Sequence, residues 1–238
     1  QKHSDCIETI TVVTAQHRQM LDQVLETFRI QPNYDLDIMG KNQSLLDITA
    51  KILQKFDPIV KKELPDMILV HGDTTTTFVA SLVAFYNQVR IGHVEAGLRT
   101  FDKYSPFPEE MNRQMTDNLA DLYFAPTTDS KENLLKENHP ESAIVITGNT
   151  AIDALKLTVQ SDYYHEVLDR LDPLKKLVLV TMHRRENQGQ PMRDVFAALR
   201  EMVDVHSELE VVYPVHLSPA VQEAAKDILS GHERIHLI

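Results

Sequence analysis

Four ionisable side chains follow short apolar runs or a proline-rich string of this sequence. They are Asp73 after residues 67–70, Glu95 after residues 90–94, Glu109 after the string at 106–108, and His183 after residues 177–181. In an open parallel sheet, ligands bind just outside the carboxyl ends of the strands. Three carboxylates and an imidazole at that edge could donate and accept protons. Their placement predicts a single acid–base site.

The string around Asp73 suits a sharp turn and an anion. Gly72 allows the backbone to turn as it leaves the preceding run. The four threonines at 74–77 offer hydroxyls and exposed amides at a helix N-terminus, where phosphates bind. The alternative is that Asp73 caps the helix and the threonines form its first turn.

Two further strings allow both a structural and a functional interpretation. Glu95 and Arg99 could form a surface ion pair, but Gly97 between them at a strand exit favours a binding loop. Glu109 and Arg113 have the i, i+4 spacing of a helical ion pair, which contributes about 0.2–0.5 kcal/mol. The two prolines at 106 and 108 make the chain before Glu109 rigid. A simple ion pair does not require this, so the string favours a functional site.

His183 by itself is typical of an ordinary histidine beside a strand end. Its neighbours Arg184, Arg185 and Glu186 change that interpretation. Arginine side chains bind phosphates through charge-assisted hydrogen bonds, so this string favours an anion site.

Several common chemistries lack their sequence signatures here. The sequence contains no G-x-G-x-x-G, no P-loop and no G-x-S-x-G nucleophile elbow. On the predicted helices no two histidines stand at i, i+4 with a glutamate between them, and Cys6 is the only cysteine. We therefore expect no metal and no cofactor.

The composition is that of an ordinary globular chain of 238 residues, 42% hydrophobic and 25% charged. A net charge of -11 argues against general nucleic-acid binding, although local arginines can still bind an anion. The single cysteine fits a reducing compartment. No apolar stretch approaches the roughly 18 residues of a membrane span, and no signal peptide is recognisable. We expect a cytoplasmic protein with no membrane partner and no nucleic-acid partner.

Strand-like and helix-like segments alternate along the chain. Strands are predicted at residues 9–14, 67–70, 90–94, 122–125, 143–146, 177–181, 209–213 and from 235. Helices are predicted at residues 20–28, 47–56, 75–86, from 108, 130–137, 150–159, 191–205 and 220–229. This order predicts an α/β protein with parallel sheets.

A charged stretch at residues 160–176 separates two α/β blocks, which predicts two domains at 1–168 and 169–238. The alternative is one long sheet. The chain begins and ends close to predicted strands, so we expect a piece of a longer protein, truncated at both ends. A family resemblance, described below, implies that the first strand of the first domain and much of the second domain lie outside it and that the isolated piece is inactive.

Taken together, strings along nearly the whole chain resemble the UDP-N-acetylglucosamine 2-epimerases of the non-hydrolysing bacterial type. The strings are TAQHRQM at 14–20, HGDT at 71–74, HVEAGLRT at 93–100, PFPEEMNR at 106–113, TGNT at 147–150, HRREN at 183–187 and YPVH at 213–216. The resemblance implies two Rossmann-like domains facing a cleft, as in glycosyltransferases of the B type, the second of them binding the nucleotide.

The resemblance also implies a reaction and a set of site residues. The reaction is reversible epimerisation at C2 of UDP-N-acetylglucosamine to UDP-N-acetylmannosamine, by elimination and re-addition of UDP through a glycal. The residues implied to be catalytic are Asp73, Glu95, Glu109, Arg113 and His183. The three carboxylates would be the acid–base groups, Arg113 would orient Glu109, and His183 would support the pyrophosphate. The residues implied to bind substrate are His183, Arg184 and Arg185.

Regulation and assembly are implied in the same way. Bacterial members of the family bind a second UDP-N-acetylglucosamine beside the active site, and the matching allosteric residues here are Gln16, Gln19, Arg184 and His216. Asn42 stands where the family often has an arginine, which would weaken that site. The family also implies a homodimer that feeds cell-wall polysaccharide biosynthesis.

Three other functions fit parts of the sequence. A hydrolysing 2-epimerase would share the strings but release free N-acetylmannosamine. A glycosyltransferase of the B type would share the fold, but the carboxylate cluster argues against it. A nucleotide-sugar-binding fragment without activity would keep only the binding residues.

Overall fold

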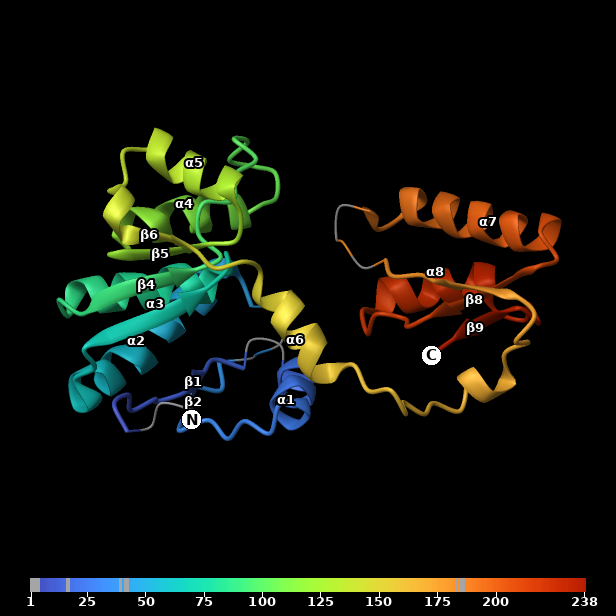
Figure 1. The fold of residues 1–238 in the computed structure, drawn as a ribbon, viewed down its shortest axis with the longest axis horizontal. Coiled ribbons are helices and arrows are strands. Elements are labelled where there is room, and N and C mark those ends of the chain that lie inside the picture. Colours follow the sequence, from blue (N-terminus) through green and yellow to red (C-terminus); the bar gives the residue numbers. More distant parts are fainter. Residues whose placement is uncertain (1–4, 16–17, 39, 41–42, 183, 185–186) are drawn as a thin grey trace. The chain divides into compact units, whose positions relative to one another are not determined.

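The computed structural model describes residues 5–15, 18–38, 40, 43–182, 184 and 187–238. It divides into two compact units, Gln1–Val159 and Gln160–Ile238. Each unit combines parallel strands with helices packed against them (Figure 1). The predicted boundary between residues 168 and 169 falls a short way into the second unit.

The first unit contains most of the secondary structure. Its elements in chain order are β1 (Val12–Val13), α1 (Arg18–Thr27), β2 (Tyr34–Asp35), α2 (Leu45–Glu63), β3 (Met67–His71), α3 (Thr75–Tyr86), β4 (Arg90–Val94), α4 (Glu109–Leu119), β5 (Leu122–Ala125), α5 (Thr128–Lys136), η1 (Glu141–Ala143), β6 (Ile144–Ile146) and α6 (Thr150–Thr158). Those of the second unit are η2 (Leu168–Arg170), β7 (Lys176–Leu179), α7 (Gln190–Val205), β8 (Leu209–Tyr213), α8 (Pro219–Leu229) and β9 (Ile235–Leu237).

The strands of the described residues form parallel sheets. β1 pairs with β2, a four-stranded sheet has the order β3-β4-β5-β6, and the sheet of the second unit has the order β7-β8-β9. Because neighbours in the two larger sheets are also neighbours in the chain, right-handed crossovers place the connecting helices on one face. Accordingly, α3 packs against both α2 and α4, and α7 packs against α8. The prediction of an α/β protein with parallel sheets is confirmed.

Each unit has its own apolar core. In the first unit, Phe56 of α2 and Val79 of α3 belong to one buried cluster between these helices and the strands. In the second unit, Phe196 of α7 and Tyr213 of β8 are fully buried, with ring centroids 5.5 Å apart. Among the described residues, no helix is both long and apolar enough to cross a bilayer.

Several local features differ from the sequence predictions; the strand predicted at residues 9–14, for example, is observed only at Val12–Val13. Helix α2 starts at a capping box made by Ser44 and Asp47, and it continues through Pro58 to Glu63 rather than ending at residue 56. Its buried stripe extends to Val60, and this packing outweighs the cost of a proline inside the helix. Strand β2 was not predicted, because two residues are too short to show the alternation of a strand.

Candidate active site

The turn between β3 and α3 presents Asp73. Gly72 has a φ of +73°, which glycine adopts at little cost, so the chain turns sharply as it leaves the strand. Thr74 rather than Asp73 caps α3, because its side chain accepts a hydrogen bond from the Thr77 amide. The Asp73 carboxylate instead accepts a hydrogen bond from the guanidinium of Arg113 in α4.

Three successive carbonyl groups of this turn accept hydrogen bonds from side chains of three different elements, α3, β4 and α4. The pairs are Thr77 to His71 at 2.6 Å, His93 to Gly72 at 2.7 Å, and Asn112 to Asp73 at 3.0 Å. These hydrogen bonds hold the backbone of the turn in one conformation, and with it the position of Asp73, before any ligand binds. The turn that carries Asp73 is therefore preorganised.

Glu95 occupies the corresponding turn after β4. Its φ of +71° is unusual for a glutamate, and its amide donates to the Phe124 carbonyl at 3.0 Å. A Cβ atom placed on Gly72 would lie 3.5 Å from Oε2 of Glu95, and the same oxygen is 3.8 Å from Nε2 of His71. The carboxylate therefore lies against the Asp73 turn. Strained residues of this kind cluster at functional sites, which favours a functional role for Glu95.

Arg113 connects the two turns. Its guanidinium donates to the Asp73 carboxylate, to Glu110 at 2.7 Å and to the Leu98 carbonyl at 3.2 Å, while only 7% of its side chain is exposed. The expected pairing of Arg113 with Glu109 is wrong. Glu110, three residues before Arg113, lies on the same face of the helix and takes that place.

Glu110 is a fully buried carboxylate that the sequence did not single out. It accepts hydrogen bonds from the amides of Thr100 at 3.1 Å and Phe101 at 3.2 Å, and from the Gln114 side chain at 2.8 Å. Burial raises the pKa of Glu110, but these hydrogen bonds and the Arg113 charge outweigh burial and hold the pKa below its usual value. Glu110 stays ionised and ties the loop after β4 to α4.

Glu109 is the first residue of α4, with a partly buried side chain. It lies one helical turn before Arg113, whose guanidinium contacts Asp73. The structure thus brings Asp73 and Glu95 to the same pair of turns and places Glu109 at the adjoining helix end. Three carboxylates that approach one region from three elements can serve acid–base chemistry on more than one side of a bound molecule.

The buried face of α4 is polar, which is unusual for a helix between strands. It consists of Glu110, Asn112, Arg113, Thr116 and Asp117. Burying such groups costs free energy unless each finds a partner, so this helix serves a hydrogen-bond network as well as a core. The sequence carried a signal for this, because residues 110, 113 and 117 share one helical face at the spacing i, i+3, i+7.

Four charged or ionisable side chains next to the two turns contact one another in sequence. Nδ1 of His93 is 2.6 Å from Oδ1 of Asp117, and Arg99 donates to Oδ2 of Asp117 at 2.7 Å and to Glu137 at 2.7 Å. Arg99 therefore pairs with Asp117 and Glu137 rather than with Glu95. Burial raises the pKa of Asp117, but the His93 contact and the Arg99 charge outweigh burial and hold the pKa below its usual value.

Replacement of Asp117 by asparagine is expected to remove part of the acid sensitivity of folding. Because the pKa of Asp117 is lowered on folding, its stabilisation is fully present above the unfolded value of about 3.9 and is lost as the pH falls toward the folded value. Below about pH 4, the slope of unfolding free energy against pH should be shallower in Asp117→Asn by up to roughly 1.4 kcal/mol per pH unit. Urea unfolding between pH 3 and 7 measures this slope, and an unchanged slope would contradict the assignment.

The remaining predicted site residues are only partly described. Gln16, His183 and Arg185 lie outside the described residues, and Gln19 falls within α1. Arg184 and His216 are described, and both belong to the second unit. Arg184 is exposed. His216 is partly buried, and its Nδ1 accepts a hydrogen bond from the Ser218 amide at 3.1 Å.

The string from His232 to His236 has the H-E-x-x-H spacing of some zinc sites, but it does not lie on a helix. It runs from a turn into β9, and its histidines contact carboxylates: His232 is 3.0 Å from Asp204, and His236 is 2.7 Å from Glu210. A zinc site of that kind needs both histidines on one helical face, so these contacts are structural.

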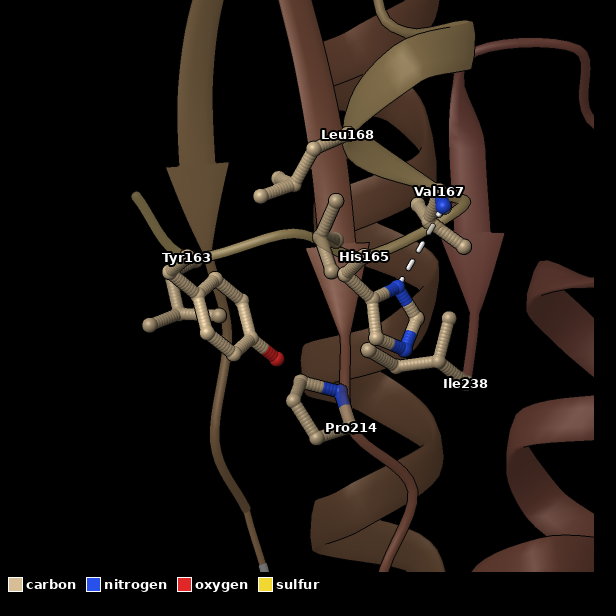
Figure 2. Close-up of a pocket in the computed structure, with 8 residues that line it drawn as sticks. Tyr163, His165, Val167, Leu168, Pro214 and Ile238 are labelled. Carbon is tan, nitrogen blue, oxygen red and sulfur yellow. Dashed lines mark hydrogen bonds between the residues drawn. The ribbon is translucent and has the colours of Figure 1, made fainter. Parts of the chain in front are cut away.

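The second unit also contains an apolar pocket of about 260 Å³ (Figure 2). Its lining residues are Tyr163, His165, Val167, Leu168, Leu179, Val212, Pro214 and Ile238. The His165 ring accepts a hydrogen bond from the Val167 amide at 3.3 Å, drawn as a dashed line in Figure 2. The side chains that line this pocket are apolar or aromatic, apart from the imidazole of His165.

The fold and the site define a class, a Rossmann-like α/β protein with a carboxylate cluster at the carboxyl ends of parallel strands. The model of one protein family, described as UDP-N-acetylglucosamine 2-epimerase, matches residues 1–238. The chain belongs to the UDP-N-acetylglucosamine 2-epimerase family. The resemblance predicted from the sequence strings is confirmed.

Individual relatives agree with this assignment. The UDP-N-acetylglucosamine 2-epimerase of Bacillus subtilis is 56% identical over 232 residues, which are 98% of this chain and 61% of that protein. Among solved structures, S. aureus MnaA with UDP has a TM-score of 0.92 at 52% identity, covering all of this chain and 62% of its own. The Neisseria meningitidis enzyme bound to UDP-GlcNAc has a TM-score of 0.92 at 43% identity, with coverages of 100% and 66%. This chain thus spans about three-fifths of the length of the B. subtilis relative.

Proposed function

We propose that the protein containing this chain interconverts UDP-N-acetylglucosamine and UDP-N-acetylmannosamine without hydrolysing them. The observation that carries the proposal is the placement of Asp73 and Glu95 at adjoining turns, with Glu109 one helical turn from Arg113, in a chain of the epimerase family. The N. meningitidis relative crystallised with UDP-GlcNAc, which supports this nucleotide sugar as the substrate.

The chemistry explains why several carboxylates are needed. The proton on C2 of the sugar is weakly acidic and has no adjacent carbonyl, so direct abstraction would leave an unstabilised carbanion. Elimination of UDP across C1–C2 gives a glycal instead, and re-addition of UDP with protonation on the other face gives the epimer. Removing a proton from one face and returning one to the other requires two positioned proton-transfer groups. Asp73, Glu95 and Glu109 supply them.

Cationic side chains have two tasks in this reaction. Arg113 holds the Asp73 carboxylate in one orientation through a direct hydrogen bond. The departing UDP carries negative charge, and His183 with Arg184 and Arg185 would stabilise it at the phosphates. Arg184 is exposed, as a residue in that role would be.

The reaction is tested by incubating the whole protein that contains this chain with UDP-N-acetylglucosamine in deuterated water. We expect UDP-N-acetylmannosamine that carries deuterium at C2 and keeps its UDP, because proton transfer at C2 exchanges with solvent. Release of free N-acetylmannosamine would identify a hydrolysing epimerase. Unchanged substrate with bound nucleotide sugar would identify a binding protein and contradict the proposal. The same assay on residues 1–238 alone is expected to show no conversion.

We also propose a second nucleotide-sugar site formed by Gln16, Gln19, Arg184 and His216, on the basis of the sequence resemblance. A trace of UDP-N-acetylglucosamine should raise the initial rate measured from UDP-N-acetylmannosamine, and equal rates with and without it would reject the site.

The cellular setting is proposed on similar grounds. The lone cysteine, Cys6, supports a reducing compartment and hence the cytoplasm. The family resemblance supports a homodimer and a role in supplying cell-wall polysaccharide. Light scattering of the gene-encoded protein measures the assembly state.

A further inference from the structure

We propose that His93 and Asp117 form a positioning pair that holds the Asp73 turn and the Glu95 turn in register with each other. Neither residue reaches the reacting atoms. The pair acts through the backbone of the two turns, and its effect on turnover rests on the proposed epimerase function.

The contacts of His93 assign its charge. The ring is fully buried, Nδ1 lies 2.6 Å from a carboxylate oxygen of Asp117, and Nε2 lies 2.7 Å from the Gly72 carbonyl oxygen. A carbonyl oxygen only accepts, and so does an ionised carboxylate. Asp117 stays ionised because Arg99 and the Gly97 amide both donate to its other oxygen, at 2.7 and 3.2 Å. Both ring nitrogens of His93 therefore donate, and the ring is an imidazolium.

Each end of the pair terminates on a turn that carries a carboxylate. On one side, His93 binds the carbonyl of Gly72, the residue before Asp73. On the other side, Asp117 binds the amide of Gly97, two residues after Glu95. The two turns leave neighbouring strands, β3 and β4, and one buried ion pair from β4 and α4 spans both of them.

The pair cannot lose one member without consequence for the other. His93, Asp117 and Arg99 have side chains that are 0% exposed, and Glu137 completes the alternation of positive and negative charge. Removing one partner of a buried pair leaves an uncompensated charge. That charge would draw in water or a new partner at the point where the backbone of both turns is held.

The test compares His93→Gln and Asp117→Asn with a matched control. The control is His236→Gln, because His236 also pairs with a carboxylate, Glu210 at 2.7 Å, between neighbouring strands, but it belongs to the second unit, whereas both turns belong to the first. All three variants and the unaltered protein are made from the complete gene. Melting temperatures show how much each substitution destabilises the fold.

Two readouts are then taken. We expect kcat for epimerisation to fall by about 10- to 100-fold in His93→Gln and Asp117→Asn, with a much smaller change in KM, because the substrate still binds while the acid–base groups are displaced. The double variant should lose little more than the worse single variant, since both break one unit. Amide hydrogen exchange should become faster at residues 71–75 and at 95–99 together. His236→Gln should change neither kcat nor exchange at these turns.

The outcomes separate this inference from the proposed function. If the unaltered protein does not epimerise, the proposed function fails, and hydrogen exchange alone decides the positioning role. Unchanged amide hydrogen exchange in His93→Gln, or faster exchange at only one of the two turns, would contradict the proposal that the pair holds both turns. A fall in kcat no larger than that of the control would overturn its effect on turnover.

Discussion

Replacement of Glu95 by glutamine is expected to lower kcat by at least about 100-fold, the usual scale for losing a positioned acid or base. Glutamine keeps the size of the side chain and can occupy the same place beside Gly72, but it does not exchange protons. Substrate affinity should change much less than kcat. Steady-state kinetics of the gene-encoded protein, with the products separated by chromatography, measures both quantities.

The matched control is Glu132→Gln, because Glu132 is an exposed glutamate on α5, and we expect it to keep normal turnover. Asp73→Asn and Glu109→Gln should resemble Glu95→Gln rather than the control. Near-normal turnover of Glu95→Gln would show that another group transfers the proton and that the backbone strain at this residue has a different purpose.

Replacement of Gly97 by alanine is expected to destabilise the fold by about 2–5 kcal/mol. The φ of +82° costs an alanine roughly 1–2 kcal/mol. A Cβ atom at this position would also lie 2.2 Å from the backbone oxygen of Ser130 and 2.9 Å from the Leu134 side chain, so α5 would have to move, at a further cost of about 1–3 kcal/mol.

Gly148→Ala separates the two contributions. Gly148 has almost the same φ, +80°, but a Cβ atom there would meet nothing within 4 Å. Gly148→Ala should therefore lower the free energy of unfolding only by the cost of the positive φ, roughly 1–2 kcal/mol. Urea unfolding at neutral pH measures both variants. Equal losses would mean that the approach of Ser130 to Gly97 is not the source of the instability.

The order of strands and helices was predictable because each element carries its own periodic pattern. Strand β4, for example, lies at residues 90–94 as predicted. The two-stranded sheet was harder to predict from the sequence. Its strand Tyr34–Asp35 is too short to show any period and is defined by its pairing with Val12–Val13. The end of α2 was missed because packing of Val60, which local sequence does not reveal, carries the helix past Pro58.

The site was predictable in its residue types but not in its pairings. A carboxylate at the end of an apolar run marks a sheet edge, and that rule found Asp73 and Glu95. Helical spacing predicted Glu109 as the partner of Arg113, whereas the structure pairs Arg113 with Glu110, at the spacing i, i+3. His93 and Asp117 are 24 residues apart, and no local pattern links a strand residue to a later helix.

The anchoring of the Asp73 turn has a consequence for inhibitor design. Thr77, His93 and Asn112 fix its three carbonyls from within the first unit, so the entropy of ordering this backbone is lost when the unit folds. A ligand that contacts the turn does not have to supply that entropy again. A small, rigid compound shaped to the ordered turn should therefore keep most of its contact energy as affinity, whereas flexibility in the compound itself would be the main loss.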